Sequence, residues 1–407
     1  MESAKIIARL ARMLKQVGLA EELAHEALVS ALEQWPTTGV PDKPGAWLMT
    51  AAKNRAFDEL RRRKLLERSH ESIAHEAALL GSAGEDPSEA ADDDIGDDLV
   101  RLMFIACHPV LSTEARTALT LRLLGGLSTA EIARAFLVPE PTIAQRIVRA
   151  RRTLAEARVP FEAPRAEERA VRLSSVLEVI YLIFNEGYAA TSGGDWMRPA
   201  LCEEALRLGR ILAELLPAEA EVHGLVGLME IQASRTAARV DSEGEPILLL
   251  AQNRIRWNQL MIRRGLSALE HAQALGGTLG PYALQAAIAA CHARAPTAAD
   301  TDWAQIVALY DALAQITPSP IVELNRVVAV SMAFGAAAAL ELVETLCSEP
   351  RLKNYALLPS VRGDLLEKLG RFDEARTEFS RAAGLTQNER DRKLLLGRAA
   401  ACGSGNQ

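Results

Sequence analysis

The sequence predicts an all-α protein, and three observations support that class. Alanine and leucine dominate the 407 residues, and aromatic residues make up only 4% of them. Stretches of alternating polar and apolar residues are few, which favours helices over strands. One stretch, residues 118–152 (ALTLRLLGGLSTAEIARAFLVPEPTIAQRIVRARR), has the features of two short helices joined by a tight turn.

This stretch predicts a helix-turn-helix. Ser128 is followed three residues later by Glu131, which is the capping-box pattern at a helix start. The pair Val138–Pro139 should end that helix, and Pro139 or Pro141 suits the first turn of the next. The inner face of the second helix would carry Ile143, Ile147, Ala150 and Leu154, and the outer face Thr142, Gln145, Arg146, Arg149 and Arg152. A second helix with outward glutamine and arginine suits the major groove of DNA, although any helix pair with a basic solvated face shows a similar pattern.

Charge and cysteine usage narrow the class further. The net charge is −7, but residues 53–68 carry seven basic side chains against three acidic ones, and residues 85–98 carry eight acids and no base. Local patches of this kind decide where a polyanion can bind. The five scattered cysteines contain no Cys-x-x-Cys pair, which favours reduced thiols in a cytoplasmic protein without a metal site or cofactor. No signal peptide and no membrane span are expected.

Three helices are expected at the start of the chain. The first covers residues 3–16 and should end near Gly18, the second covers residues 20–35, and a loop of turn-forming residues follows at 36–44. The third covers residues 45–63, carries Trp47 and ends in the basic run 61–64. A tryptophan and a basic run on one helix suit single-stranded nucleic acid, whereas the basic run alone also suits a solvated helix C-terminus.

Two segments here carry a resemblance. AEELAHEALVSALEQWP and PGAWLMTAAKNRAFDELRRRK resemble region 2 of bacterial RNA polymerase sigma factors of the extracytoplasmic-function class, with His25 at a usual glutamine and Lys53 at a usual arginine. The resemblance implies that residues 1–66 bind core RNA polymerase and the melted −10 strand. The polymerase-binding residues would be Glu22, Leu23 and Glu26. The −10 residues would be Trp47, Lys53, Asn54, Arg61 and Arg62.

The helix-turn-helix is similar to region 4 of the same class. That similarity assigns residues 100–160 to the −35 promoter element and residues 67–99 to an acidic flexible linker. His108, beside Pro109, is expected to be structural. The −35 residues would be Thr142, Gln145, Arg146, Arg149, Arg151 and Arg152.

Residues 161–407 are expected to form a helical domain of the tetratricopeptide type. Gly363, Ala375, Phe379 and Ala382 match the small and large positions of such a repeat. Residues 181–195 (YLIFNEGYAATSGGD), with residues 239–257 and 301–303, resemble the sigma-factor subgroup that carries a C-terminal tetratricopeptide-like domain. We expect an interdomain contact at Phe184, Asn185, Tyr188 and Asp195, and a regulatory protein or ligand as partner.

The sequence therefore predicts an alternative sigma factor whose C-terminal domain controls its activity. No nucleophile–base pair, phosphate loop or metal spacing is present, so an enzyme is not expected. The alternative is a helix-turn-helix regulator with a solenoid sensor that acts without polymerase. A solenoid scaffold with vestigial DNA-binding helices is a third interpretation.

Overall fold

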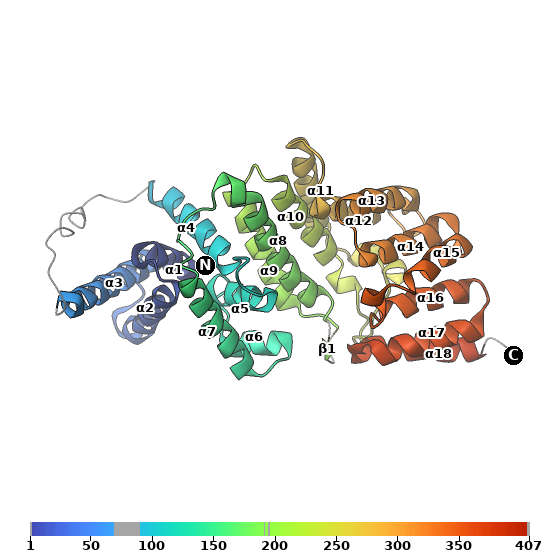
Figure 1. Ribbon diagram of the computed structural model, residues 1–407, viewed down its shortest axis with the longest axis horizontal. Coiled ribbons are helices and arrows are strands. Elements are labelled where there is room, and N and C mark those ends of the chain that lie inside the picture. The colour runs from blue at the N-terminus through green and yellow to red at the C-terminus, as the bar shows by residue number, and fades with distance from the viewer. Residues whose placement is uncertain (1, 69–89, 191, 194–195, 405–407) are drawn as a thin grey trace. The chain divides into compact units, whose positions relative to one another are not determined.

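The computed structural model describes residues 2–68, 90–190, 192–193 and 196–404 (Figure 1). These residues are almost entirely helical, which confirms the predicted fold class. They form two compact units, residues 1–179 and 180–407, and the boundary falls inside α8 (Ala166–Tyr188). Regular strand in the described part of the chain is confined to β1 (Ser192–Gly193) and β2 (Gln387–Asn388), which pair in parallel.

The first unit begins with three helices that pack on one another: α1 (Glu2–Leu14), α2 (Val17–Thr38) and α3 (Pro44–Arg68). Two expected boundaries were wrong. The first helix ends before Lys15, which adopts φ 53°, so Gly18 lies inside α2 and caps nothing. The expected loop at Pro36 is the last turn of α2, because a proline there removes only one helical hydrogen bond. Gly39, with φ 83°, ends the helix instead.

The second half of this unit contains α4 (Ala90–Ala106), α5 (Thr113–Leu123), α6 (Thr129–Phe136) and α7 (Glu140–Glu156). Helix α4 starts inside the expected linker, whose residues 69–89 lie outside the described residues. Asp98, expected in that linker, is fully buried, and its carboxylate contacts Arg101 at 2.8 Å and Arg9 of α1 at 3.4 Å. His108 Nδ1 accepts a hydrogen bond from the Val110 backbone N–H at 3.1 Å, which confirms its structural role.

The first half of α8 belongs to the same unit. Arg172 donates to the Phe104 carbonyl at 2.8 Å, and the Ser175 hydroxyl donates to the Cys107 carbonyl. Arg116 of α5 forms an ion pair with Glu178 at 2.9 Å. These contacts hold residues 166–179 against the helix-turn-helix half of the first unit.

The second unit is a series of helices in which neighbours along the chain pack on each other (Figure 1). Short 3₁₀ turns interrupt the series: η1 (Thr236–Ala238), η2 (Leu249–Ala251), η3 (Arg254–Arg256) and η4 (Pro350–Leu352). Its α-helices after α8 are α9 (Pro199–Leu215), α10 (Ala220–Ala233), α11 (Gln259–Ala274), α12 (Pro281–Arg294), α13 (Trp303–Ile316), α14 (Pro320–Phe334), α15 (Ala336–Leu346), α16 (Leu357–Lys368), α17 (Phe372–Leu385) and α18 (Glu389–Ser404).

The expected tetratricopeptide positions lie in this series. Gly363 of α16 faces Phe379 of α17, and a Cβ atom on the glycine would come within 2.8 Å of the phenylalanine ring. Ala375 and Ala382 are buried beside the same ring. Gly370, with φ 73°, makes the turn between the two helices. The small and large positions therefore interlock as that repeat requires.

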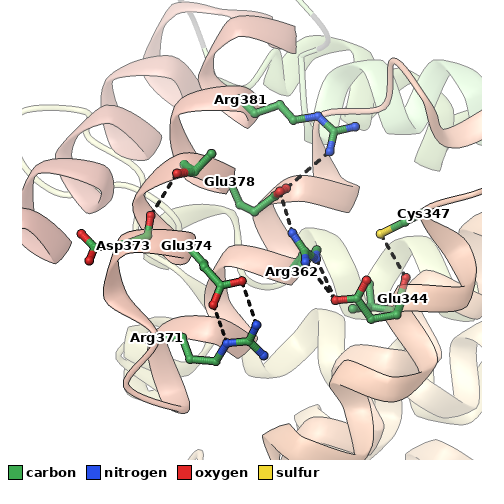
Figure 2. A network of polar contacts seen from close by, with 10 residues as sticks. Glu344, Cys347, Arg362, Arg371, Asp373, Glu374, Glu378 and Arg381 are labelled. Carbon is green, nitrogen blue, oxygen red and sulfur yellow. Dashed lines mark hydrogen bonds and ion pairs between the residues drawn. The ribbon is translucent and has the colours of Figure 1, made fainter.

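Ion pairs link three successive helices of the series (Figure 2). Arg362 of α16 contacts Glu344 of α15 at 2.9 Å and Glu378 of α17 at 2.8 Å. Glu378 is buried and also lies 3.5 Å from Arg381. A buried carboxylate with two guanidinium partners has its charge compensated, so the network fixes how these helices pack.

Candidate nucleic-acid interface

The turn before α6 has the predicted capping box. The Ser128 N–H donates to Glu131 Oε2 at 2.8 Å, and the Glu131 N–H donates to Ser128 Oγ at 3.2 Å. These two bonds satisfy donors that would otherwise be unpaired at the helix start. The Ser128 backbone N–H and the Ser128 hydroxyl both donate to Glu131 Oε2 at 2.8 Å, and these bonds hold the pKa of Glu131 below its ordinary value of 4.5 because they favour the carboxylate.

The connection between α6 and α7 is a tight turn. Leu137 adopts a left-handed conformation with φ 50°, and the Val138 N–H donates to the Ala133 carbonyl at 3.1 Å. Pro139 is the N-cap residue of α7, and Pro141 lies in its first turn. The buried residues of α7 are Ile143, Ile147, Ala150 and Leu154, which confirms the predicted inner face.

The opposite face of α7 is polar. Gln145 and Arg149 are exposed and have no side-chain partner among the described residues. Arg152 is exposed and pairs with Glu156 one turn later at 2.6 Å. Thr142 and Arg146 are half-buried at the edges of this face. Val148 lies beside Arg149 with 62% of its surface exposed. This valine was not among the predicted outer-face residues, although its helical position places it there.

Arg151 lies elsewhere. Its guanidinium pairs with Glu21 of α2, and the other oxygen of that carboxylate accepts a hydrogen bond from Arg122 Nε of α5 at 2.7 Å. Glu21 is only 6% exposed. This three-residue contact, the Glu21 junction, links the N-terminal helices to the helix-turn-helix. The structure thus places Arg151 on a protein contact, which differs from its expected place on the DNA-facing side.

The expected −10 residues lie along α3. The Trp47 ring packs edge-on against Trp35 of α2, with ring centroids 5.6 Å apart. Burial, followed by the charges of Arg9 and Arg12, lowers the pKa of Lys53. Asn54 is exposed. Arg61 and Arg62 are exposed, and each lies three residues after an acidic side chain. Arg61 pairs with Asp58 at 3.8 Å, and Arg62 pairs with Glu59 at 3.3 Å.

The expected polymerase-binding residues divide between the two faces of α2. Glu22 and Glu26 are exposed, whereas Leu23 is buried in the helical core. Leu23 was expected at a surface contact, but its position on the helix directs its side chain into the core. Val29 and Leu32, with 42% and 75% of their surfaces exposed, continue the outer face. Exposure of two aliphatic side chains on one helix face is typical of a protein-binding surface.

Two segments of the first unit match the models of known protein families. Residues 3–65 match the model described as "Sigma-70 region 2", and residues 101–154 match "Sigma-70, region 4". The chain belongs to the sigma-70 family. This sigma factor has the extracytoplasmic-function architecture, and its domains imply binding to core RNA polymerase and promoter DNA. Sigma factors direct the polymerase and are not enzymes, so that expectation is also confirmed.

The C-terminal part and the whole chain also have relatives. Residues 172–273 match a "Family of unknown function (DUF6596)". "Uncharacterized protein R00370" of Rhizobium meliloti (strain 1021) is 45% identical over 383 residues, which are 93% of this chain and 89% of the relative. The solved structure "Crystal Structure of the Yeast Tom70" has 12% identity and a TM-score of 0.32, and it covers 99% of this chain and 82% of that one. A similarity at that score carries no conclusion.

The residues expected at an interdomain contact make contacts inside the second unit. Phe184 is fully buried, and its ring stacks on Tyr188 at 5.6 Å. Tyr188 in turn packs against Arg239, whose Cζ lies 3.6 Å from the ring centroid. Asn185 is half-buried, and Asp195 lies outside the described residues.

The described residues contain no candidate metal cluster and no helix suited to a membrane. No cluster of three or more histidine, cysteine, aspartate or glutamate side chains there could hold a metal ion. None of the helices in the described ranges combines the length and the apolar character that crossing a membrane would need.

Proposed function

We propose that the outward face of α7 reads the −35 element. The single observation that supports this most is the division of α7 into a buried aliphatic face and an exposed polar face. Gln145 and Arg149 lie at its centre and would contact base edges, because these side chains can pair with two atoms of a base. The remaining members of this face would hold phosphates or flank the bases: Thr142, Arg146 and Arg152. Arg151 is not among them, because it pairs with Glu21.

Region 2 would hold the melted −10 strand along α3. Trp47 offers an aromatic ring for stacking, and Asn54 is an exposed polar group on the same helix. Lys53, Arg61 and Arg62 supply positive charge. Both arginines are exposed, whereas Asp58 is exposed and Glu59 is half-buried. Ion pairs of exposed side chains are weak, so a phosphate can compete for the arginines.

The outer face of α2 would bind core polymerase. Glu22 and Glu26 give this face negative charge, and Val29 and Leu32 give it apolar area. Leu23 would contribute to polymerase binding indirectly, because its buried side chain packs α2 into the helical core. Because core polymerase works in the cytoplasm, this assignment also places the protein there.

Capture of core polymerase on the immobilised protein tests the α2 assignment. The double variant Glu22→Gln, Glu26→Gln should retain less polymerase, since both charges of the proposed surface are lost. Asp42→Asn removes an exposed acid from the segment between α2 and α3, outside this helix face, and should retain the wild-type amount. Equal retention by all three proteins would contradict the assignment. Tight operator binding without polymerase would favour the regulator instead.

The C-terminal domain would control promoter output. Support comes from the length of the second unit, which adds residues 180–407 to a pair of domains that already covers both promoter elements. A chain truncated after Val179 keeps the α8 contacts of Arg172 and Ser175. Promoter output from the truncated chain should differ from wild type at equal polymerase occupancy. Unchanged output would show that the domain is passive.

A further inference from the structure

The second unit contains an alternating row of arginine and aromatic side chains. Arg239 lies against Tyr188 at 3.6 Å and Trp196 at 4.4 Å, measured from Cζ to the ring centroid. Arg235 lies 5.7 Å from Tyr188 and 5.7 Å from Trp257. A third guanidinium, Arg254, lies 4.9 Å from the Trp257 ring. Three positive charges are thus gathered in one partly buried region.

Within the described ranges these three guanidinium groups donate no hydrogen bond to a carboxylate, although the charge of Asp391 acts on Arg239 and that of Asp300 on Arg254. Arg239 donates to the Tyr188 carbonyl, and Arg254 donates to the His292 and Ala295 carbonyls and to the Thr301 hydroxyl. Arg235 is only 9% exposed and has ring contacts but no side-chain hydrogen bond or ion pair in the described part of the chain. A buried cation without an anion is costly, because water no longer compensates its charge.

The pKa shifts in this region also indicate a positive local charge. Burial, and then the charges of Arg235 and Arg254, lowers the pKa of His292 to about 4. Burial and the charge of Arg235 also lower the pKa of Arg254. The field around Trp257 is therefore strongly positive, and His292 is neutral at pH 7.

Buried donors without acceptors meet at the same tryptophan. They are Trp257 Nε1, Arg254 Nε and Arg235 Nε. Such groups are rare in folded proteins, and each one is destabilising when left unpaired. All three are N–H groups, so the group that would satisfy them is an acceptor. In the same region, the buried side-chain oxygen of Gln252 accepts no hydrogen bond from the described residues.

A hollow of about 590 Å³ lies beside this region, at η3, the start of α11 and the end of α12, and Arg235 is not among the residues that line it. Arg254, Trp257 and Gln252 line it, and the exposed Arg294 lies at its rim without an ion-pair partner in the described ranges. None of the described residues that line it is acidic. Leu250 and Ile255 add an apolar wall. The volume falls in the range of small-molecule sites.

We propose that this hollow, the Arg254–Trp257 pocket, binds a small organic anion that carries a phosphate or carboxylate on an apolar ring. The anion would pair with the guanidinium groups of Arg254 and Arg294, and the ring would lie against Trp257 and the aliphatic wall. Anionic acceptors form the stronger class of hydrogen bond, so they suit this donor set better than water. The site does not depend on whether the domain controls transcription.

Titration calorimetry on the full chain tests this pocket. The probes are phenyl phosphate and benzoate as ring-bearing anions, inorganic phosphate as the anion alone and phenol as the neutral ring, all at one ionic strength. At least one ring-bearing anion should bind at a single site, about tenfold more tightly than inorganic phosphate, and phenol should not bind. A flat titration with both ring-bearing anions, or equal binding of phenol, would overturn the proposal.

Three variants locate the site. Arg254→Gln and Arg294→Gln should each weaken binding about tenfold, through loss of one charged donor. Arg263→Gln, an exposed arginine on α11 that does not line the hollow, should bind as wild type. Wild-type affinity in both pocket variants would refute the location. Because Arg294 is exposed, its variant keeps the fold.

Discussion

The Glu21 junction offers a quantitative test of how the two halves of the first unit are held together. Glu21 is 6% exposed, and its two oxygens meet Arg122 and Arg151, whose side chains are each 25% exposed. Each pair is worth about 4 kcal/mol by Coulomb's law at an effective dielectric constant of ~20. Desolvation of the carboxylate offsets much of that energy. We expect Glu21→Gln to lower the local stability of α7 by about 2 kcal/mol.

Hydrogen exchange read by mass spectrometry on residues 140–156 measures this change. A loss of about 2 kcal/mol should speed the exchange of protected α7 amides about 30-fold. Glu22→Gln is the matched control, because it removes the same charge from the next, exposed position of α2. In a double-mutant cycle, Arg151→Gln should add little once Glu21 is neutral. Exchange that stays within about threefold of wild type, or an equal effect of both glutamine variants, would refute the reasoning.

Three further predictions concern other parts of the chain. Gln145→Ala should cost about 1–3 kcal/mol in promoter binding and relax preference at one −35 position, and an unaltered preference in a randomised promoter library would contradict this role. Hydrogen bonds from Ser128 lower the pKa of Glu131 in the folded protein. The stabilisation that they give is therefore present above the ordinary pKa of 4.5 and is lost as the pH falls through the lower folded value. The variant Ser128→Ala keeps only the backbone bond, so it should lose less stability than wild type in an acid titration. Gly363→Ala should destabilise the second unit by about 1–3 kcal/mol, because the new methyl group meets an aromatic ring at 2.8 Å; Gly397→Ala in α18, where nothing lies within 4 Å, should stabilise it slightly, and equal thermal shifts would refute the packing.

Local patterns made the helix-turn-helix predictable. The capping box at Ser128 and the period of Ile143, Ile147, Ala150 and Leu154 depend on neighbours a few residues away, so the sequence contains the whole signal. The repeat positions around Phe379 were predictable for the same reason. Where the pattern and the packing agree at short range, the structure matches the expectation.

Contacts between distant residues were not predictable. Arg151 has the spacing of an outer-face residue, and only the approach of Glu21, 130 positions earlier, places it on a protein contact. Leu23 lies within a polymerase-binding motif, but its burial depends on how α2 packs. The row of arginines beside Trp257 joins segments that no local period connects. Helix ends were also missed, since Lys15 has no turn-forming character.

Transcription from a purified two-element promoter tests the central claim most directly. The template carries a −35 and a −10 element mapped in cells that express this chain, and the reaction contains core polymerase with or without the protein. We predict specific initiation only when both are present, with loss of output when either element is scrambled and reduced output from Trp47→Ala and from Arg149→Ala. Initiation that is independent of the protein, or tight and specific binding to the −35 duplex that never leads to transcription by added core polymerase, would contradict the account.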